Sequence, residues 1–276
     1  MPSNREAYFE ATKLNIPKTV IDFALQEING FSFLELTQNY DKEIKDYPKF
    51  KSVIERYLNG EMIEYIFNKT YFLSRPFYID KNVLIPRQET EQLVTMAIQM
   101  ISEEYPNKNI VIGDVCCGSG VIGLSVAASL PNNKYVLTDI SKEAIRVSKQ
   151  NTLELKIQDV IFLEGDMLQP IIEKGIKLDV LLCNPPYIAS QETIDEKTWN
   201  QEPHLALLAN PPTKFYEKVF QEYQKVMQNE FLMIFEIGED MEESLTALIN
   251  KYLPSSKYCF DKDLYGKTRF LSIIQK

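Results

Sequence analysis

Apolar residues in the first 70 positions recur with the period of α-helices. The clearest case is the stretch from Tyr47 to Gly60, which ends on a helix stop at Asn59-Gly60. Its apolar positions follow the i, i+3, i+4, i+7, i+8 spacing of one helix face: Phe50, Val53, Ile54, Tyr57 and Leu58. No strand-like alternation interrupts this region. The pattern predicts a small N-terminal helical domain over residues 1–70, most simply a bundle.

Between residues 70 and 87 the pattern changes to aromatic and β-branched residues around a polar Asp80-Lys81-Asn82 segment. Such residues on both sides of a polar turn are typical of a β-hairpin. We therefore expect a hairpin over residues 71–87, linking the helical domain to a second domain over residues 88–276.

After residue 88, short apolar runs alternate with amphipathic segments. Strands are expected at 109–115, 134–139, 160–166, 178–184 and 231–238, and helices at 88–105, 120–130, 141–155, 213–227 and 239–253. Short buried strands separated by helices predict an α/β fold of parallel βαβ units with helices on both faces. Residues 257–275 predict two more strands with no room for a crossover helix, so this last pair is expected to be antiparallel.

The composition narrows the class of protein. A chain of 276 residues, 45% of them apolar, is long enough for one large and one small domain. A formal net charge of −9 leaves no dominant basic surface, so we expect no direct nucleic-acid binding. We expect the chain to act as a monomer.

The sequence also bears on cellular location. It contains no run of about 18 apolar residues, and its N-terminus lacks the apolar core of a signal peptide. The four cysteines form no C-x-x-C pair and no disulfide framework, which fits a reducing compartment. We expect a soluble cytoplasmic protein with no membrane partner.

His204 is the single histidine. A lone loop histidine is more often solvated or structural than catalytic, and it has no second histidine with which to share a metal ion. Zinc chemistry and histidine triads are therefore disfavoured, and no metal is expected.

Candidate chemistry is sought just after the strands, because ligands of open α/β sheets bind beyond the carboxyl ends of the strands. The segment from Asp114 to Gly120 follows one such strand, and Gly118 and Gly120 let the backbone turn tightly beside a ligand. A purely structural turn would use the same glycines. No Lys-Ser/Thr pair follows, so a phosphate-binding P-loop is disfavoured. Cys116 and Cys117 are expected to be small apolar side chains rather than nucleophiles.

Two further strand ends carry acids. Asp139 lies about 20 residues beyond the glycines, a spacing that favours hydrogen bonds to ribose hydroxyls. The alternative is an N-cap for the helix that opens at Ser141. Asp166 is placed to accept from an adenine amino group with Met167 against the ring, although a plain turn would have a similar sequence.

The fourth strand end is Asn184-Pro185-Pro186-Tyr187. Each proline holds the residue before it in extended geometry, so the Asn184 amide oxygen and nearby carbonyls form a rigid set of acceptors. Acceptors of this kind suit a planar NH2 group, with Tyr187 packed against it. A second copy, Asn210-Pro211-Pro212, leads into a predicted helix and is interpreted as a helix entry.

The glycine loop, the ribose acid, the ring contact and the Asn-Pro-Pro-Tyr segment follow one another in this order. This arrangement resembles that of class I S-adenosylmethionine-dependent methyltransferases that act on planar amino nitrogens. Residues 85–91, Ile-Pro-Arg-Gln-Glu-Thr-Glu, look like the PRxETE signature of the release-factor glutamine methyltransferases, the HemK/PrmC family. Glu202-Pro203 and residues 236–238 and 263–269 also resemble this family's landmarks, so the resemblance covers the whole chain.

The resemblance implies a Rossmann-like fold, mostly parallel with an antiparallel last strand, and S-adenosylmethionine as cofactor. Residues 116–120 would wrap its methionine part, Asp139 would hold the ribose, and Met167 would lie by the adenine. The expected cofactor-binding residues are Cys116, Cys117, Gly118, Ser119, Gly120, Asp139, Asp166, Met167 and Asn184.

For the substrate, the resemblance implies the glutamine of a Gly-Gly-Gln loop in a class I peptide chain release factor. The expected catalytic and substrate-binding residues are Asn184, Pro185, Pro186 and Tyr187. Two positions depart from the family pattern: Cys116 replaces the usual first glycine of the loop, and residues 209–214 replace a glycine-rich stretch.

The same motifs are compatible with two other functions. A nucleic-acid amine methyltransferase would use the same Asn-Pro-Pro-Tyr segment, and a noncatalytic release-factor-binding module is a second rival. Arg87, Glu89 and Glu91 have either a structural role at a helix start or a role in a cleft that binds cofactor or partner.

Overall fold

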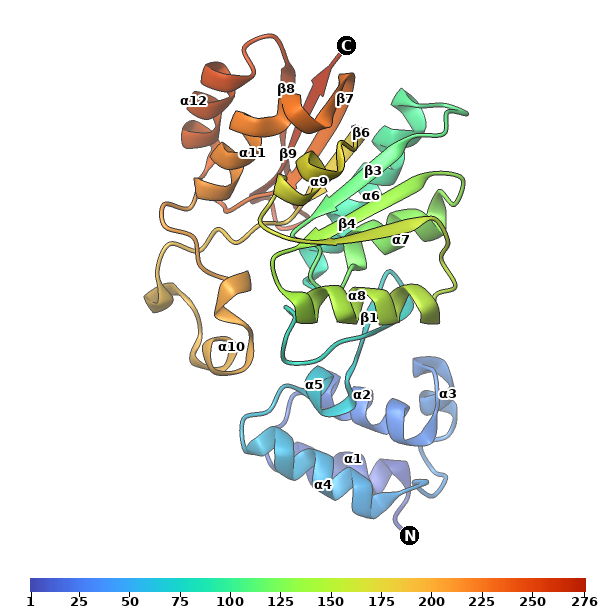
Figure 1. Cartoon of the computed structure of the whole chain (residues 1–276). Helices are drawn as coiled ribbons and strands as arrows, with labels where there is room; N and C mark the ends of the chain where they lie inside the picture. The colour runs from blue at the N-terminus through green and yellow to red at the C-terminus, as the bar shows by residue number, and fades with distance from the viewer. The chain divides into compact units, whose positions relative to one another are not determined.

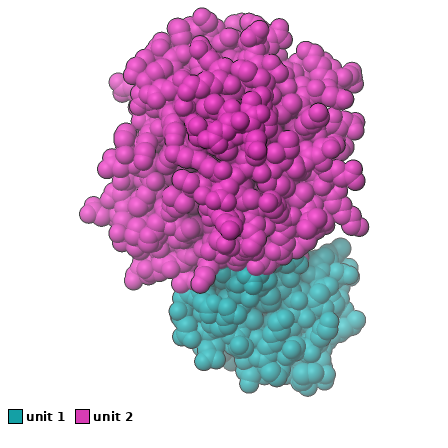
Figure 2. Space-filling model, viewed as in Figure 1, with its two compact units in different colours: residues 1–69 teal, residues 70–276 magenta.

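The computed structural model describes residues 1–276 and divides into two compact units, Met1–Lys69 and Thr70–Lys276 (Figure 2). No helix in either unit has both the length and the apolar character needed to cross a membrane.

The first unit is built from five helices (Figure 1). They are α1 (Asn4–Thr12), α2 (Lys18–Asn29), α3 (Phe33–Gln38), α4 (Tyr47–Leu58) and α5 (Ile63–Phe67). Local sequence sets the starts: Ser3 and Ser32 form capping boxes, and the Asp46 side chain accepts from the Lys49 N–H. An apolar core common to all five helices holds the unit together.

Helix α4 buries most of the predicted face. Phe50, Val53 and Ile54 are at most 6% exposed, whereas Leu58, at the end of the same predicted face, is 52% exposed. At about 100° per residue, Leu58 lies about 80° around the helix from Phe50, at the margin of the apolar stripe.

A β-hairpin opens the second unit, but its turn is not where the sequence predicted it. Strands β1 (Lys69–Phe72) and β2 (Arg75–Tyr78) are joined at Leu73-Ser74, both of which have positive φ. Two consecutive positive φ angles match the right-handed twist of a hairpin. Asn, Asp and Gly are the residues that usually signal such a turn, and neither Leu73 nor Ser74 is one of them. Asp80 instead accepts hydrogen bonds from the backbone and side chain of Asn82, which makes a separate local turn.

The rest of the second unit is a seven-stranded sheet in the order β5-β4-β3-β6-β7-β9-β8. The strands are β3 (Val111–Val115), β4 (Lys134–Asp139), β5 (Val160–Glu164), β6 (Leu178–Cys183), β7 (Met227–Glu236), β8 (Lys257–Lys262) and β9 (Thr268–Gln275). Strand β9 pairs antiparallel with both β7 and β8, while β3 to β7 pair in parallel. The predicted α/β fold with an antiparallel last pair is confirmed.

Helices cover both faces of the sheet (Figure 1). They are α6 (Gln88–Glu104), α7 (Val121–Ser129), α8 (Lys142–Glu154), α9 (Gln169–Lys174), α11 (Lys214–Val226) and α12 (Glu242–Tyr252). Helix α10 (Glu196–Gln201) belongs to the connection between β6 and β7 and buries none of its residues. Alternation along the strands separates two cores: Val180 and Leu182 pack with α6 and α7, whereas Leu181 and Cys183 pack with α9, α11 and α12.

The short helical elements were not predicted. They are α9, α10 and the single 3-10 turns Gln191–Thr193 and His204–Ala206. Elements of at most six residues complete fewer than two helical turns, so they leave no periodic pattern in the sequence.

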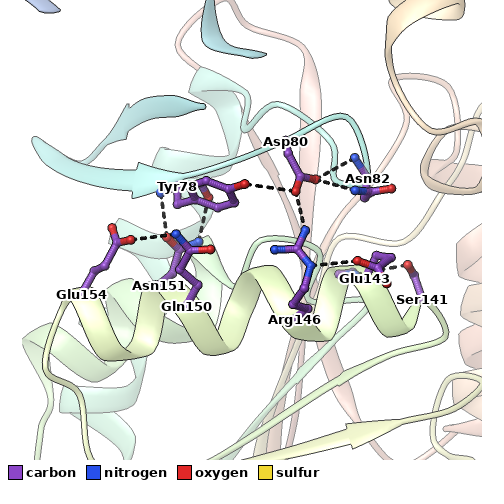
Figure 3. A network of polar contacts seen from close by, with 10 residues as sticks. Tyr78, Asp80, Asn82, Ser141, Glu143, Arg146, Gln150, Asn151 and Glu154 are labelled. Carbon is purple, nitrogen blue, oxygen red and sulfur yellow. Dashed lines mark hydrogen bonds and ion pairs between the residues drawn. The ribbon is translucent and has the colours of Figure 1, made fainter. Parts of the chain in front are cut away.

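A polar network joins the hairpin to α8 (Figure 3). The buried Asn151 side chain accepts from the Tyr78 N–H at 2.7 Å and donates to the Tyr78 and Ser119 carbonyls, both at 2.9 Å. Arg146 forms ion pairs with Asp80 and Glu143. Burial works to raise the pKa of Asp80, but the hydrogen bonds from Asn82 and Arg146 outweigh it and leave that pKa lowered. The segment after the hairpin is therefore held against α8 at two points.

Replacing Asn151 tests this attachment. We expect Asn151→Ala to lower the free energy of unfolding by about 2–4 kcal/mol, because two part-buried backbone groups of Tyr78 and the buried Ser119 carbonyl lose a hydrogen-bond partner. The neighbouring Gln150 bonds only to Glu154 one turn along α8, so Gln150→Ala is the matched control and should change stability by less than about 0.5 kcal/mol. Urea denaturation measures both, and equal effects of the two substitutions would contradict this account.

Candidate functional site

The carboxyl ends of β3, β4, β5 and β6 surround a cavity of about 320 Å³. The chain runs from β3 outward to β5 and then returns to β6 on the other side of β3, so the cavity lies at the switch point of the sheet. The predicted cofactor residues that line it are Cys116, Cys117, Gly118, Ser119, Asp139, Asp166, Met167 and Asn184. Gly120 does not line the cavity; it is the N-cap residue of α7.

The loop after β3 has the backbone of a tight glycine turn. Cys116, Gly118 and Gly120 all have positive φ, at 61°, 54° and 81°. Cys116 therefore adopts the left-handed conformation that favours glycine, which costs free energy for a residue with a side chain. The Gly118 N–H donates to the Asp139 carboxylate at 2.9 Å, which ties the loop to the end of β4.

Asp139 faces the cavity, and the capping role belongs to another residue. The Ser141 side chain caps α8 by accepting from the Ala144 N–H, while Asp139 accepts from the Ser141 N–H at 2.8 Å. Burial raises the pKa of Asp139, against the opposing effect of these backbone N–H donors. Each carboxylate oxygen has further acceptor capacity, so the side chain can also accept from hydroxyl groups.

Asp166 and Met167 lie together after β5 with Lys218 of α11. The Lys218 ammonium forms an ion pair with Asp166, and all three residues line the cavity. Met167 is 4% exposed, and its sulfur lies 3.4 Å from the Cys116 sulfur. Lys218 was not predicted, because it stands 52 positions from its partner and no local pattern connects them.

A second cavity, of about 440 Å³, adjoins the first. Asn184 and Pro186 line both cavities, whereas Pro185 and Tyr187 line only the second. The Asn-Pro-Pro-Tyr segment, residues 184–187, therefore lies at the junction of the two cavities. Burial raises the pKa of Tyr187, and the negative charge of Glu236 adds to this effect.

Glu236, at the end of β7, is a buried carboxyl group in the lining of the second cavity. It is 2% exposed and accepts from the hydroxyls of Thr90 at 2.7 Å and Tyr187 at 3.3 Å. Burial raises its pKa, while Thr90, the Arg269 charge and Tyr187 counteract the shift. The sequence showed Thr90 and Glu236 only as parts of family landmarks and did not indicate that they touch.

Two of the charged residues at the start of α6, Arg87 and Glu91, take different roles. One Arg87 nitrogen lies 2.8 Å from both carboxylate oxygens of Glu202, whose side chain is fully buried, and Arg87 lines the second cavity. The Glu91 carboxylate accepts from the Leu73 N–H at 2.6 Å and so holds the hairpin. Arg87 therefore belongs to the cleft and Glu91 to the framework.

The single histidine has a structural environment. His204 stacks on Trp199 with ring centroids 3.5 Å apart, and its Nε2 lies 2.8 Å from the Trp199 carbonyl oxygen. The second proline pair precedes Thr213, the N-cap residue of α11, so it leads into that helix as predicted.

Comparison with known proteins identifies the family. The model of the methyltransferase small domain matches residues 94–231. Over 81% of this chain and 80% of its own length, the release factor glutamine methyltransferase of Staphylococcus aureus is 35% identical. The protein of the same name from Mycoplasma mycoides is 30% identical over 95% of this chain and 94% of its own length. The chain belongs to the release factor glutamine methyltransferase family.

A solved structure supports the fold assigned to this family member. The catalytic domain of hMettl16, crystallised with MAT2A 3′UTR hairpin 6, covers 80% of this chain and 91% of its own with a TM-score of 0.56. The sequences are 14% identical, so the likeness concerns the fold alone.

A buried carboxyl lies beneath the glycine loop. Asp114 of β3 is fully buried, its Oδ2 accepts from the Gly123 N–H at 2.8 Å, and its Oδ1 has no hydrogen-bond partner. A Cβ on Gly123 would lie 2.9 Å from this Oδ2, so only glycine allows α7 to approach so closely. Burial raises the pKa of Asp114 to about 7.

This shift predicts a pH dependence of stability. Because the pKa of Asp114 in the folded chain, about 7, exceeds the ordinary value of 3.8, the folded state binds more protons between these pH values. The free energy of unfolding therefore falls as pH rises through this window, by up to about 1.4 kcal/mol per pH unit from this one group. Asp114→Asn removes the titration and should flatten the slope when urea denaturation is measured from pH 5 to 7.5. Parallel curves for wild type and variant would contradict the shift.

Proposed function

We propose that this chain transfers a methyl group from S-adenosylmethionine to the side-chain amide nitrogen of the glutamine in the Gly-Gly-Gln motif of class I peptide chain release factors. Its family membership supports the reaction class and the kind of substrate. The observation that carries the proposal is the position of Asn184, which lines both cavities. A substrate group that Asn184 binds in the second cavity would therefore lie next to a cofactor bound in the first cavity.

The first cavity suits the cofactor. Its volume of about 320 Å³ lies in the range of small-molecule sites, and one wall carries the half-buried Asp139 carboxylate. Asp139 would accept from the ribose hydroxyls, and Met167 with Phe215 offers an apolar surface for the adenine. The loop from Cys116 to Ser119 would follow the methionine part. Once bound, S-adenosylmethionine supplies a methyl group on a positively charged sulfur, and S-adenosylhomocysteine is the product that leaves.

The second cavity suits a glutamine side chain. Asn184 Oδ1 and the Pro185 carbonyl would accept the two amide hydrogens, and the Tyr187 ring would pack against the planar group. An amide nitrogen is a weak nucleophile because its lone pair is delocalised into the carbonyl. The residues therefore act by orientation, which is worth up to about 7–11 kcal/mol in favourable systems. Acceptors on the amide hydrogens also stabilise positive charge as it develops on the nitrogen.

The proposal extends to partners and location. We propose that the chain works in the cytoplasm as a monomer and takes the release factor as its partner rather than nucleic acid. The net charge of −9 supports this choice, because a protein that grips nucleic acid gains much of its affinity by neutralising phosphates.

Asn184→Ala tests the central residue. We expect turnover to fall by about 100-fold or more, because one acceptor for the attacking amide is lost, while the affinity for S-adenosylmethionine changes by less than about threefold. Asn210→Ala is the matched control, since Asn210 begins the second Asn-Pro-Pro copy, is exposed and lines neither cavity. Labelled methyl transfer to a purified release factor measures turnover. Full activity of Asn184→Ala would remove this residue from its role.

The substrate is tested separately. Purified chain with labelled cofactor should modify a wild-type release factor and leave unmodified a factor whose Gly-Gly-Gln glutamine is replaced by alanine. RNA and DNA are tested alongside at several salt concentrations. Methylation of nucleic acid without methylation of the release factor would favour the nucleic-acid amine methyltransferase, and cofactor binding without any transfer would favour a noncatalytic binding module.

A further inference from the structure

Four side chains from three parts of the second unit form one polar chain at the junction of the two cavities. The Asn184 Nδ2 lies 3.5 Å from the Thr90 Oγ1, and the Thr90 hydroxyl donates to Glu236 at 2.7 Å. The other Glu236 oxygen accepts from the Tyr187 hydroxyl at 3.3 Å. Thr90 and Glu236 are 3% and 2% exposed, so water does not compete for these contacts.

The direction of these hydrogen bonds follows from the number of protons available. A hydroxyl has one proton to donate, and Thr90 gives it to the Glu236 carboxylate, which in its ionised form only accepts. Thr90 therefore has only lone pairs to offer Asn184. An amide group next to such an acceptor turns its NH2 end toward it, and its oxygen then points the other way.

This orientation matters because an asparagine amide is nearly symmetric in shape and opposite in chemistry at its two ends. With Nδ2 toward Thr90, the free end of Asn184 is an acceptor and suits a substrate NH2 group. The reverse orientation would set one NH2 against another, with no acceptor between them. Sterics alone distinguish these two states poorly.

We propose that Thr90 and Glu236 are positioning residues that hold the Asn184 amide with its oxygen toward the substrate, and that Glu236 holds Tyr187 at the same time. This inference rests on the proposed glutamine methyl transfer. Glu236 suits the role because β7 pairs with β6, which ends immediately before Asn184. The Asn184–Thr90 contact of 3.5 Å is long, as catalytic hydrogen bonds often are without substrate.

The test compares Thr90→Val, which keeps the shape but removes the hydroxyl, with Thr90→Ser, which restores it. We expect the kcat of Thr90→Val to fall about 10–100-fold, while the KM for S-adenosylmethionine stays within about threefold. Thr90→Ser should recover kcat to within about threefold of wild type. Thr95→Val is the matched control, because Thr95 lies on the same helix, is exposed and bonds only to the Glu91 carbonyl.

A second measurement does not depend on turnover. In ¹⁵N spectra of side-chain amides, the Asn184 NH2 signals, assigned by their loss in Asn184→Ala, should shift and exchange faster with water in Thr90→Val and return in Thr90→Ser. Unchanged signals in Thr90→Val would overturn the proposed positioning of Asn184 by Thr90 and Glu236, as would a wild-type kcat in that variant. A loss of kcat that serine does not rescue would also overturn it.

The two measurements separate this inference from the proposed function. If the wild-type chain methylates no release factor, the proposed function is wrong. The amide spectra then test by themselves whether Thr90 and Glu236 position Asn184. If the wild-type chain methylates the release factor and Thr90→Val has the same kcat, the positioning role of Thr90 is wrong and the proposed function is unaffected.

Discussion

The site depends on the parallel pairing of β3 with β4 on one side and β6 on the other. Parallel strands bring their carboxyl ends to one edge, and the reversal of strand order around β3 keeps the loops there from covering one another. The glycine loop, Asp139 and Asn184 meet at this edge although up to 68 positions separate them in the chain. The positions of the individual side chains then follow from local backbone geometry: the left-handed turn at Cys116 and the prolines after Asn184.

The second requirement is a buried polar framework behind the site. Glu236 and Glu202 are carboxylates withdrawn from water, and each meets partners from the start of α6: Thr90 for Glu236 and Arg87 for Glu202. Burying a carboxylate costs free energy unless it is hydrogen-bonded or paired, so these contacts strongly favour a single arrangement of the segments that carry them. The same contacts hold the walls of the second cavity, which explains why a helix start distant in sequence belongs to the active region.

The acidic side chains at the strand ends have different roles, which the sequence around each of them does not distinguish. Asp139 keeps acceptor capacity toward the first cavity while holding the glycine loop, whereas Asp166 is paired with Lys218. Asp114 lies beneath the loop and packs against α7. Their burial and partners distinguish them: Asp139 faces the first cavity, Asp166 forms a half-exposed ion pair in the lining of the same cavity, and Asp114 belongs to the framework.

The sequence by itself determined the class of fold, most long helices and strands, and the strand ends that line the first cavity, because periodicity and proline or glycine geometry act within a few residues. It also indicated that Asn184 stands on a rigid strand end, since its prolines restrict the backbone locally. Only the tertiary structure decided the hairpin turn at Leu73-Ser74, the short helices, and the partners of Arg87, Glu91, Asp166 and Glu236. The physical reason is that an ion pair or hydrogen bond between residues 18 to 146 positions apart arises from packing and leaves no local pattern in the chain.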